Sequence, residues 1–122
     1  MNSNFCRLMP SKIEGAGVGV FSIELIPIGI DPFGGCNTDL RKMYNDEFHL
    51  LSEEKKKMVR DFCYYTNGGW SVPKNFNTLD ISWFVNSSDS PNLSFDTNTG
   101  RYETLREISI GEELTYEYVV YE

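Results

Sequence analysis

The sequence has few of the residues that metal centres and disulfide frameworks require. It contains three cysteines, Cys6, Cys36 and Cys63, which form no Cys-x-x-Cys pair, and His49 is its one histidine. A structural zinc site needs about four such ligands at short spacings, and a disulfide framework normally uses an even number of cysteines. We therefore expect no metal, no disulfide framework, and reduced thiols in an intracellular protein of the cytoplasm or nucleus.

Long apolar runs are also absent from the sequence. No segment approaches the roughly 20 apolar residues that a membrane span requires. The start, MNSNFCRLMPSK, lacks the basic flank and apolar stretch of a signal peptide. We expect a protein that is not secreted and does not bind a membrane. The Asn-x-Ser patterns at Asn86 and Asn92 would be glycosylation signals only in a secreted protein.

Positive charge is scarce, with 11 Lys and Arg against 18 Asp and Glu and a net charge of −7. A nucleic-acid-binding domain normally has a basic surface, so we expect no direct contact with nucleic acid. An acidic surface suits a basic protein or peptide partner, and it equally serves solubility alone. The 122 residues, 40% of them hydrophobic, are enough for one globular domain with one core.

The sequence does contain a series of short β-branched and aromatic runs. Residues 18–30 predict two short strands joined by a Pro-Ile-Gly turn. Four more strands are expected from the runs DISWFV, NLSFD, RYETLR and ELTYEYVVY. One helix is predicted from SEEKKKMVRDFCYY, with Ser52 as its N-cap and Asn67-Gly68-Gly69 at its end. The predicted fold class is mostly β with one main helix, in a single domain over residues 1–122.

Three segments contain candidates for chemistry, and each has a purely structural alternative. The glycines of residues 14–22 do not match Gly-x-Gly-x-x-Gly, because Val20 stands at the third glycine position, but they let a ligand approach bare backbone. Asn86 opens a polar loop, where an Asn side chain often only bonds nearby backbone. Strand alternation places Tyr116 and Tyr118 on one face, where paired tyrosines are usually core packing.

In chain order these segments resemble the motifs of the SET domain, the fold of most protein-lysine methyltransferases. The matching parts are GVGVFS (17–22), NSSDSPN (86–92) and GEELTYEY (111–118), and the resemblance extends from about Ser11 to Tyr118. It implies a SET fold of short curved sheets with a C-terminal pseudoknot. It also implies that S-adenosyl-L-methionine is the methyl donor, with S-adenosyl-L-homocysteine as product and no metal.

The same resemblance assigns roles to individual residues. Tyr118 matches the catalytic tyrosine, and Tyr116 matches the position that tunes how many methyl groups are added. A tyrosine at that position implies mono- or dimethylation. The implied cofactor-binding residues are Gly17, Val18, Gly19, Trp83, Asn86 and Ser87. Further walls of the substrate channel are expected from Tyr64, Tyr65 and Tyr121.

Two positions depart from the family pattern. Ser87 stands where the family usually has a histidine, and Trp83 stands where it often has an arginine. We expect no cysteine-rich, zinc-binding tail after the last motif, so closure of the channel would depend on Tyr121, a second copy in a homodimer, or the substrate. The leading hypothesis is methylation of a lysine-rich protein such as a histone tail. The alternative is a catalytically degenerate SET module that binds a basic protein or peptide.

Overall fold

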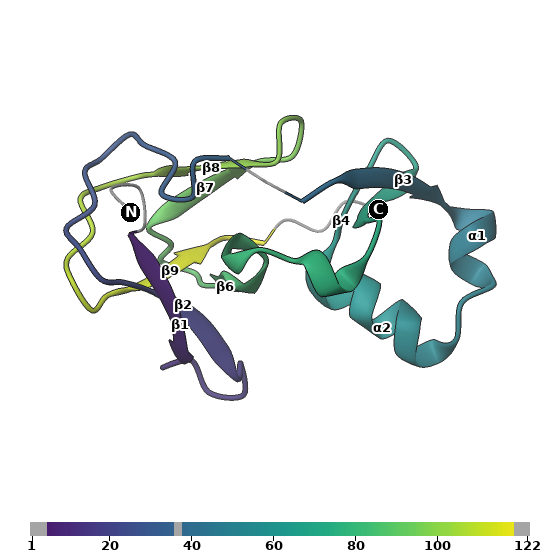
Figure 1. Cartoon of the computed structure of the whole chain (residues 1–122), viewed down its shortest axis with the longest axis horizontal. Coiled ribbons are helices and arrows are strands. Elements are labelled where there is room, and N and C mark those ends of the chain that lie inside the picture. Colours follow the sequence, from purple (N-terminus) through teal and green to yellow (C-terminus); the bar gives the residue numbers. More distant parts are fainter. Residues whose placement is uncertain (1–4, 36–37, 119–122) are drawn as a thin grey trace. The chain divides into compact units, whose positions relative to one another are not determined.

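The computed structural model describes residues 5–35 and 38–118, which form two compact units (Figure 1). The first unit contains residues 5–35 and 80–118, and the second contains residues 38–79. Each unit has its own sheet. The fold is mostly β, as the sequence predicts, whereas a single domain over residues 1–122 stays a prediction.

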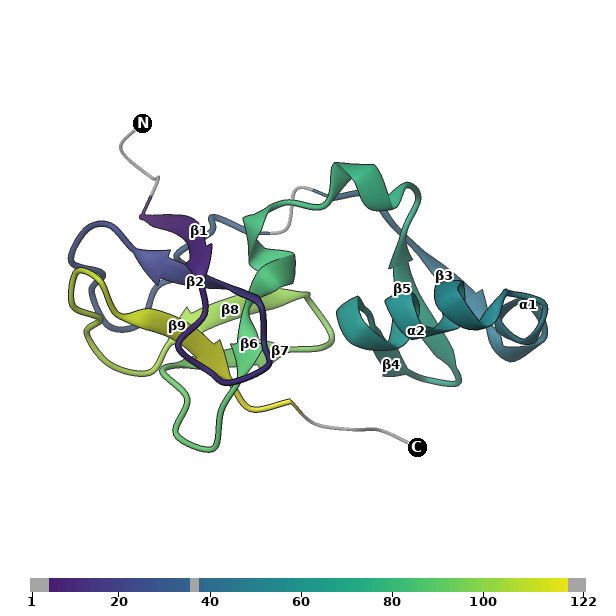
Figure 2. The same ribbon diagram turned by 90° about the horizontal axis from the view of Figure 1, so that it is seen from below.

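The first unit is a six-stranded sheet with the last strand of the chain in its middle. The path of the sheet runs through β1 (Cys6–Pro10), β2 (Val18–Ser22), β9 (Glu113–Tyr116), β7 (Leu93–Asp96) and β8 (Arg101–Thr104), and β6 (Asn86–Ser87) also pairs with β9. Strand β9 is antiparallel to β2 and parallel to both β6 and β7. It therefore joins segments that are far apart in the sequence (Figure 2).

The core of this unit is a cluster of aliphatic side chains that are almost completely buried: Val20, Ile26, Val85, Leu93, Ile108 and Leu114. Ile26 and Ile108 also form an antiparallel bridge, in which each amide donates to the other's carbonyl oxygen at 2.9 Å. All of β2 after its first residue is buried, because the strand is paired on both sides and packs against the short helix η2 (Ile81–Phe84).

Two of the predicted strands of this unit are wrong. The run DISWFV forms the 3-10 helix η2, because the Asp80 carboxylate accepts a hydrogen bond from the Ser82 amide at 2.9 Å and caps the turn. The second strand expected within residues 18–30 is reduced to the single bridge at Ile26. The last strand also ends earlier than expected, at Tyr116.

The second unit is a three-stranded antiparallel sheet with two helices. Its order is β3 (Leu40–Tyr44), β5 (Gly69–Pro73) and β4 (Tyr64–Thr66), accompanied by α1 (Asn45–His49), α2 (Glu53–Phe62) and the 3-10 turn η1 (Phe76–Thr78). The predicted N-cap of α2 is confirmed, since the Ser52 hydroxyl accepts from the Lys55 amide at 3.3 Å.

The predicted end of that helix is wrong. Helix α2 stops at Phe62, and Cys63 is already extended, with φ −104° and ψ 162°. Tyr65 then lies in a strand, where its ring packs edge-on against Trp70 with centroids 5.3 Å apart. Asn67 and Gly68, with φ of 52° and 80°, form the tight turn of the β4–β5 hairpin instead of a helix cap.

The described residues include two of the three cysteines. Cys6 and Cys63 are free thiols, and burial raises the pKa of each to about 12. Cys36 lies outside the described residues. Within residues 5–35 and 38–118, no helix is both long and apolar enough to cross a bilayer. Nor do these ranges contain a group of three His, Cys, Asp or Glu placed to hold a metal.

Candidate functional site

The glycine-rich turn between β1 and β2 is a closed loop. The Ser11 amide donates to the Gly17 carbonyl oxygen at 2.7 Å, which brings the two ends of the loop together. Gly17 has φ +75°, a conformation that L side chains rarely adopt. Val18 follows with 44% of its surface exposed, at the start of β2. The loop thus presents backbone and one exposed aliphatic side chain.

The Glu113 carboxylate ties this loop to the middle of the sheet. Its two oxygens accept from the Ser11 hydroxyl at 2.8 and 3.1 Å and from the Lys12 amide at 3.0 Å. The Asn86 side-chain amide donates to the same carboxylate at 3.2 Å. We call Ser11, Asn86 and Glu113 the site network. Its members come from the β1–β2 loop, β6 and β9, which only the fold brings together.

The site network explains why residue 19 is a glycine. Gly19 is buried, and a Cβ atom there would lie 2.9 Å from the Glu113 carboxyl carbon, with a carboxylate oxygen nearer still. The same Cβ would be 3.2 Å from the Asn86 side-chain nitrogen. The carboxylate is held by hydrogen bonds and cannot move aside without losing them. Gly19 is therefore required by Glu113, whereas the sequence suggested only that a ligand approaches bare backbone.

Asn86 also contacts the glycine-rich turn directly. Its Nδ2 donates to the Val18 carbonyl oxygen at 2.9 Å, in addition to its bond with Glu113. Both amide hydrogens have acceptors, which fixes the assignment of nitrogen and oxygen in this side chain. In the part of the chain that the structure describes, no hydrogen bond to Asn86 Oδ1 is seen. That oxygen is an acceptor available to a ligand.

Ser87 and the tail after β9 lie next to each other. The Tyr118 amide donates to the Ser87 hydroxyl at 3.2 Å, and the Ser88 amide donates to the Tyr116 carbonyl oxygen at 2.9 Å. These bonds extend the parallel pairing of β6 and β9. The structure thus brings Asn86, Ser87 and Tyr118 to one end of β9.

Tyr116 belongs to an aromatic cluster in the first unit. Its ring lies 5.6 Å from Tyr102, 5.9 Å from Phe95 and 6.2 Å from Tyr118, in edge-to-face arrangements. Burial raises the pKa of the Tyr116 hydroxyl, and the neighbouring Tyr118 acts in the same direction. Tyr118 itself is about one-third exposed, at 36%. Tyr116 therefore packs within the aromatic cluster, and its neighbour Tyr118 lies at the surface.

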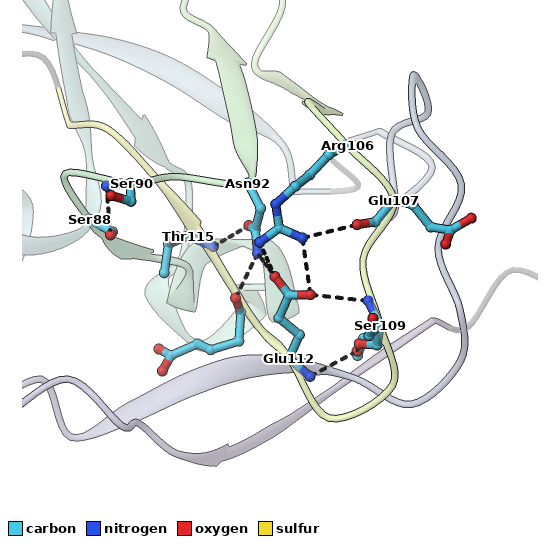
Figure 3. A network of polar contacts seen from close by, with 10 residues as sticks. Ser88, Ser90, Asn92, Arg106, Glu107, Ser109, Glu112 and Thr115 are labelled. Carbon is cyan, nitrogen blue, oxygen red and sulfur yellow. Dashed lines mark hydrogen bonds and ion pairs between the residues drawn. The ribbon is translucent and has the colours of Figure 1, made fainter.

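A second polar network surrounds the other glutamate of the motif, as Figure 3 shows. Asn92 is 2% exposed, and its Oδ1 accepts from the Thr115 amide at 2.8 Å. Its Nδ2 donates to the Glu113 carbonyl oxygen at 2.9 Å and to the Glu112 carboxylate at 3.2 Å. The buried amide therefore supplies hydrogen-bond partners for two backbone groups of β9. We call Asn92, Arg106 and Glu112 the support network.

Glu112 fixes the turn that leads into β9. It forms an ion pair with Arg106 and accepts from the Ser109 amide at 3.1 Å. Arg106, followed by the Ser109 and Asn92 bonds, holds the pKa of this carboxyl at about 2. The side chain of Arg106 is 55% exposed, so solvent screens part of this attraction.

The remaining predicted site residues are Trp83, Tyr64, Tyr65 and Tyr121. Trp83 is half-buried on η2, which packs against β1 and β2. Tyr64 and Tyr65 lie on β4 of the second unit, and Tyr121 lies outside the described residues. Their proposed places in a substrate channel stay predictions.

Sequence reasoning missed several residues that the structure places in or beside the site. Glu113 and Asn92 were part of the quoted motifs but had no role assigned to them. Phe95 and Tyr102 were read only as strand residues. Ser11 carried no signal, since its partner is 102 positions away. A strand-pairing hypothesis that placed the glycine-rich turn beside the last motif would have suggested Glu113.

Comparisons with known proteins bear on the fold. No protein-family model matches this chain, and no curated protein matches it either. The methyltransferase domain of human PR domain-containing protein 2 is similar, with 25% sequence identity and a TM-score of 0.61, covering 98% of this chain and 80% of that one. A humanized mutant of the Chaetomium thermophilum Polycomb Repressive Complex 2, bound to an inhibitor, shares 20% identity with a TM-score of 0.63, covering 93% of this chain and 14% of that one.

These similarities span nearly the whole chain. The chain therefore has the small, mostly β SET fold that the sequence motifs predicted. The C-terminal pseudoknot stays a prediction.

Proposed function

We propose that this protein is an S-adenosylmethionine-dependent protein-lysine N-methyltransferase. The observation that carries the proposal is the meeting of three distant motifs at one end of β9, where Asn86 binds the Val18 carbonyl and Ser87 binds the Tyr118 amide. A fold shared with the methyltransferase domain of human PR domain-containing protein 2 supports the same activity class. The catalytic and cofactor-binding roles below are part of this proposal.

The residues at this end of the sheet suit the proposed cofactor chemically. Its amino groups are hydrogen-bond donors, and Asn86 Oδ1 is an acceptor without a partner among the described residues. The backbone of Gly17, Val18 and Gly19 and the backbone at Ser87 would hold the rest of the molecule. When bound, S-adenosylmethionine supplies an electrophilic methyl group on a positively charged sulfur. The carboxylate of Glu113 lies beside Asn86, so its negative charge favours a cationic ligand.

The protein's own part in the reaction is to present a neutral lysine amine. A free lysine titrates near ~10.4 and is charged at neutral pH. The aromatic cluster around Tyr116 is an apolar surface, and desolvation there lowers the pKa of an amine. Exclusion of water and alignment of the two reactants then contribute most of the rate enhancement, without a metal.

Tyr118 is the proposed catalytic tyrosine, and Tyr116 is proposed to limit the number of methyl groups. Burial keeps the Tyr116 hydroxyl protonated, so it can both donate and accept a hydrogen bond near an entering amine. Such a hydroxyl occupies space that a trimethylated nitrogen would need. We therefore expect mono- and dimethylation. The net charge of −7 favours a lysine-rich protein substrate, such as a histone tail.

The first test is a calorimetric titration with S-adenosylmethionine, followed by mass spectrometry of lysine-rich peptides and histones. Tyr118→Phe should lower methyl transfer at least about 100-fold while leaving cofactor affinity within about twofold, since catalytic groups typically contribute 10²–10⁴-fold. Full activity of Tyr118→Phe would remove its catalytic role. Efficient trimethylation by the wild type would remove the role given to Tyr116.

The second candidate function is a degenerate module that binds a basic peptide. The same measurements distinguish it from the enzyme. It predicts binding of lysine-rich peptides with neither affinity for the cofactor nor methyl transfer. The departures at Ser87 and Trp83 motivate it. The Ser87 hydroxyl, however, accepts a hydrogen bond from the Tyr118 amide. A serine in place of the usual histidine therefore has a structural role here and need not indicate a lost activity.

A further inference from the structure

We infer that Glu113 is a positioning residue, which fixes the Asn86 side chain so that its carbonyl oxygen is presented to a ligand. The inference rests on the proposed function for the identity of that ligand, a cationic molecule with N–H donors. It concerns a residue to which the motif resemblance assigns no role.

Three donors converge on the Glu113 carboxylate: the Ser11 hydroxyl, the Lys12 amide and the Asn86 Nδ2 group. An ionised carboxylate is purely an acceptor and satisfies all of them. A glutamine would offer one acceptor oxygen and an amide that is itself a donor. At least one of the converging groups would then face another donor. Because the Lys12 amide is fixed by the backbone and the Asn86 side chain can rotate, we expect Asn86 to lose its acceptor.

The consequence concerns the two orientations of the Asn86 amide. With Val18 O and Glu113 both accepting, only the orientation with Nδ2 inward satisfies the contacts, and Oδ1 must point the other way. With the carboxylate removed, the amide keeps one hydrogen bond and gains rotational freedom. A ligand would then have to order the side chain on binding, at a cost in affinity.

Gly19 gives independent evidence that this geometry is tightly fitted. The space beside its Cα is filled by the Glu113 carboxylate and the Asn86 nitrogen, to the exclusion of a single methyl group. The β1–β2 loop contacts the same carboxylate through Ser11, whose hydroxyl also accepts from the Ile13 amide at 3.0 Å. The carboxylate is therefore held by contacts with the β1–β2 loop and with Asn86 on β6.

Glu112 provides a matched control within the same motif. It is the preceding residue and carries the same carboxylate, but it bonds Arg106, Ser109 and Asn92 and has no described contact with Asn86. Glu112→Gln and Glu113→Gln are therefore equal changes in composition and charge. Only the second changes the carboxylate that Asn86 contacts.

A first experiment needs no ligand. In ¹⁵N-labelled protein, the Asn86 side-chain amide signals are assigned by their loss in Asn86→Ala. We expect these signals to exchange slowly with solvent in the wild type and in Glu112→Gln, and at least about tenfold faster in Glu113→Gln. Unchanged exchange in Glu113→Gln would overturn the inference. If that variant does not fold, Ser11→Ala removes one donor from the same carboxylate and should accelerate the exchange less; no change there would overturn it as well.

A second experiment measures S-adenosylmethionine affinity in a double-mutant cycle. We expect Glu113→Gln to weaken binding about tenfold, which corresponds to one lost hydrogen bond, and Glu112→Gln to change it less than twofold. The double variant Asn86→Ala/Glu113→Gln should bind as weakly as Asn86→Ala alone. Additive losses would show that Glu113 acts independently of Asn86 and would overturn the inference. A wild type that binds no cofactor would refute the proposed function, while the exchange measurement would still decide the positioning role.

Discussion

Glu112 and Glu113 are neighbours in the chain, yet their networks differ in what they stabilise. The support network holds Glu112 against Arg106 and the buried Asn92, and all its partners are parts of the sheet or the turn before β9. The site network holds Glu113 against a glycine-rich loop and Asn86, and it leaves an acceptor without a partner among the described residues. The comparison separates a network that serves folding from one that also prepares a surface for a ligand.

The largest expected effect comes from Asn92→Ala. This change leaves the Thr115 amide and the Glu113 carbonyl without their side-chain partner in a buried setting. We expect a loss of about 2–4 kcal/mol in the free energy of unfolding, measured in urea. Asn98→Ala, in an exposed turn, is the matched control and should cost under about 0.5 kcal/mol. Equal losses in the two variants would remove the support network's role.

Gly19→Ala is a substitution that disturbs the site network and not the support network. The added methyl displaces the Glu113 carboxylate, so we expect about 1–3 kcal/mol of destabilisation and a loss of cofactor affinity of at least about tenfold. Gly29→Ala is the control, since a Cβ atom at Gly29 would meet open space, although the positive φ of Gly29 strains any L residue placed there. It should lose stability through backbone strain alone and keep its affinity. Normal affinity in Gly19→Ala would mean that the carboxylate position does not matter.

A smaller effect is expected from acid. Pairing lowers the pKa of Glu112 to about 2 in the folded state, below the unfolded value near ~4.3. Its contribution to stability is therefore complete above about pH 5 and is lost as the pH falls towards 2. Since Arg106 is more than half exposed, we expect that contribution to be at most about 1 kcal/mol. The free energy of unfolding, measured between pH 2 and 6, should depend less on pH in Glu112→Gln than in the wild type.

The smallest effect concerns a residue in neither network. Ser52→Ala removes the cap of α2 in the second unit and should cost about 0.5–1 kcal/mol. Cofactor affinity should be unchanged in the calorimeter. A loss of affinity in Ser52→Ala would show that the two networks do not contain everything that the site requires.

The sequence predicted those features that depend on local chemistry or on ordered motifs. The cap at Ser52 and the strands β2, β7, β8 and β9 follow from neighbouring residues, and the SET fold follows from the order of three motifs. The strand prediction for residues 80–85 was wrong because a side chain overrides the strand propensity there. The Asp80 carboxylate caps η2 by accepting from the Ser82 amide. The prediction also failed at Asn67 and Gly68, whose positive φ suits a hairpin turn as well as a helix end.

The candidate site was predictable only in part, because its polar contacts are long-range. Asn86 was singled out from its motif, but its partners Val18 and Glu113 are 68 and 27 positions away. Single-sequence patterns give periodicity and turns, and they do not give the register between β2 and β9 that places Glu113 beside Gly19. The need for glycine at residue 19 therefore became clear only in the structure.

The central position of β9 also has a consequence for biosynthesis. The ribosome synthesises β9 after its partners β2, β6 and β7. The central strand of the sheet is therefore missing until residues 113–116 emerge from the exit tunnel. The hairpin of β1 and β2 is alone too small to be stable in water. The sheet of this unit cannot form until residues 113–116 have left the tunnel, and closure of such long-range pairs is slow. Nascent chains stalled before residue 112 should remain sensitive to protease, whereas chains in which residue 118 has left the exit tunnel should become resistant.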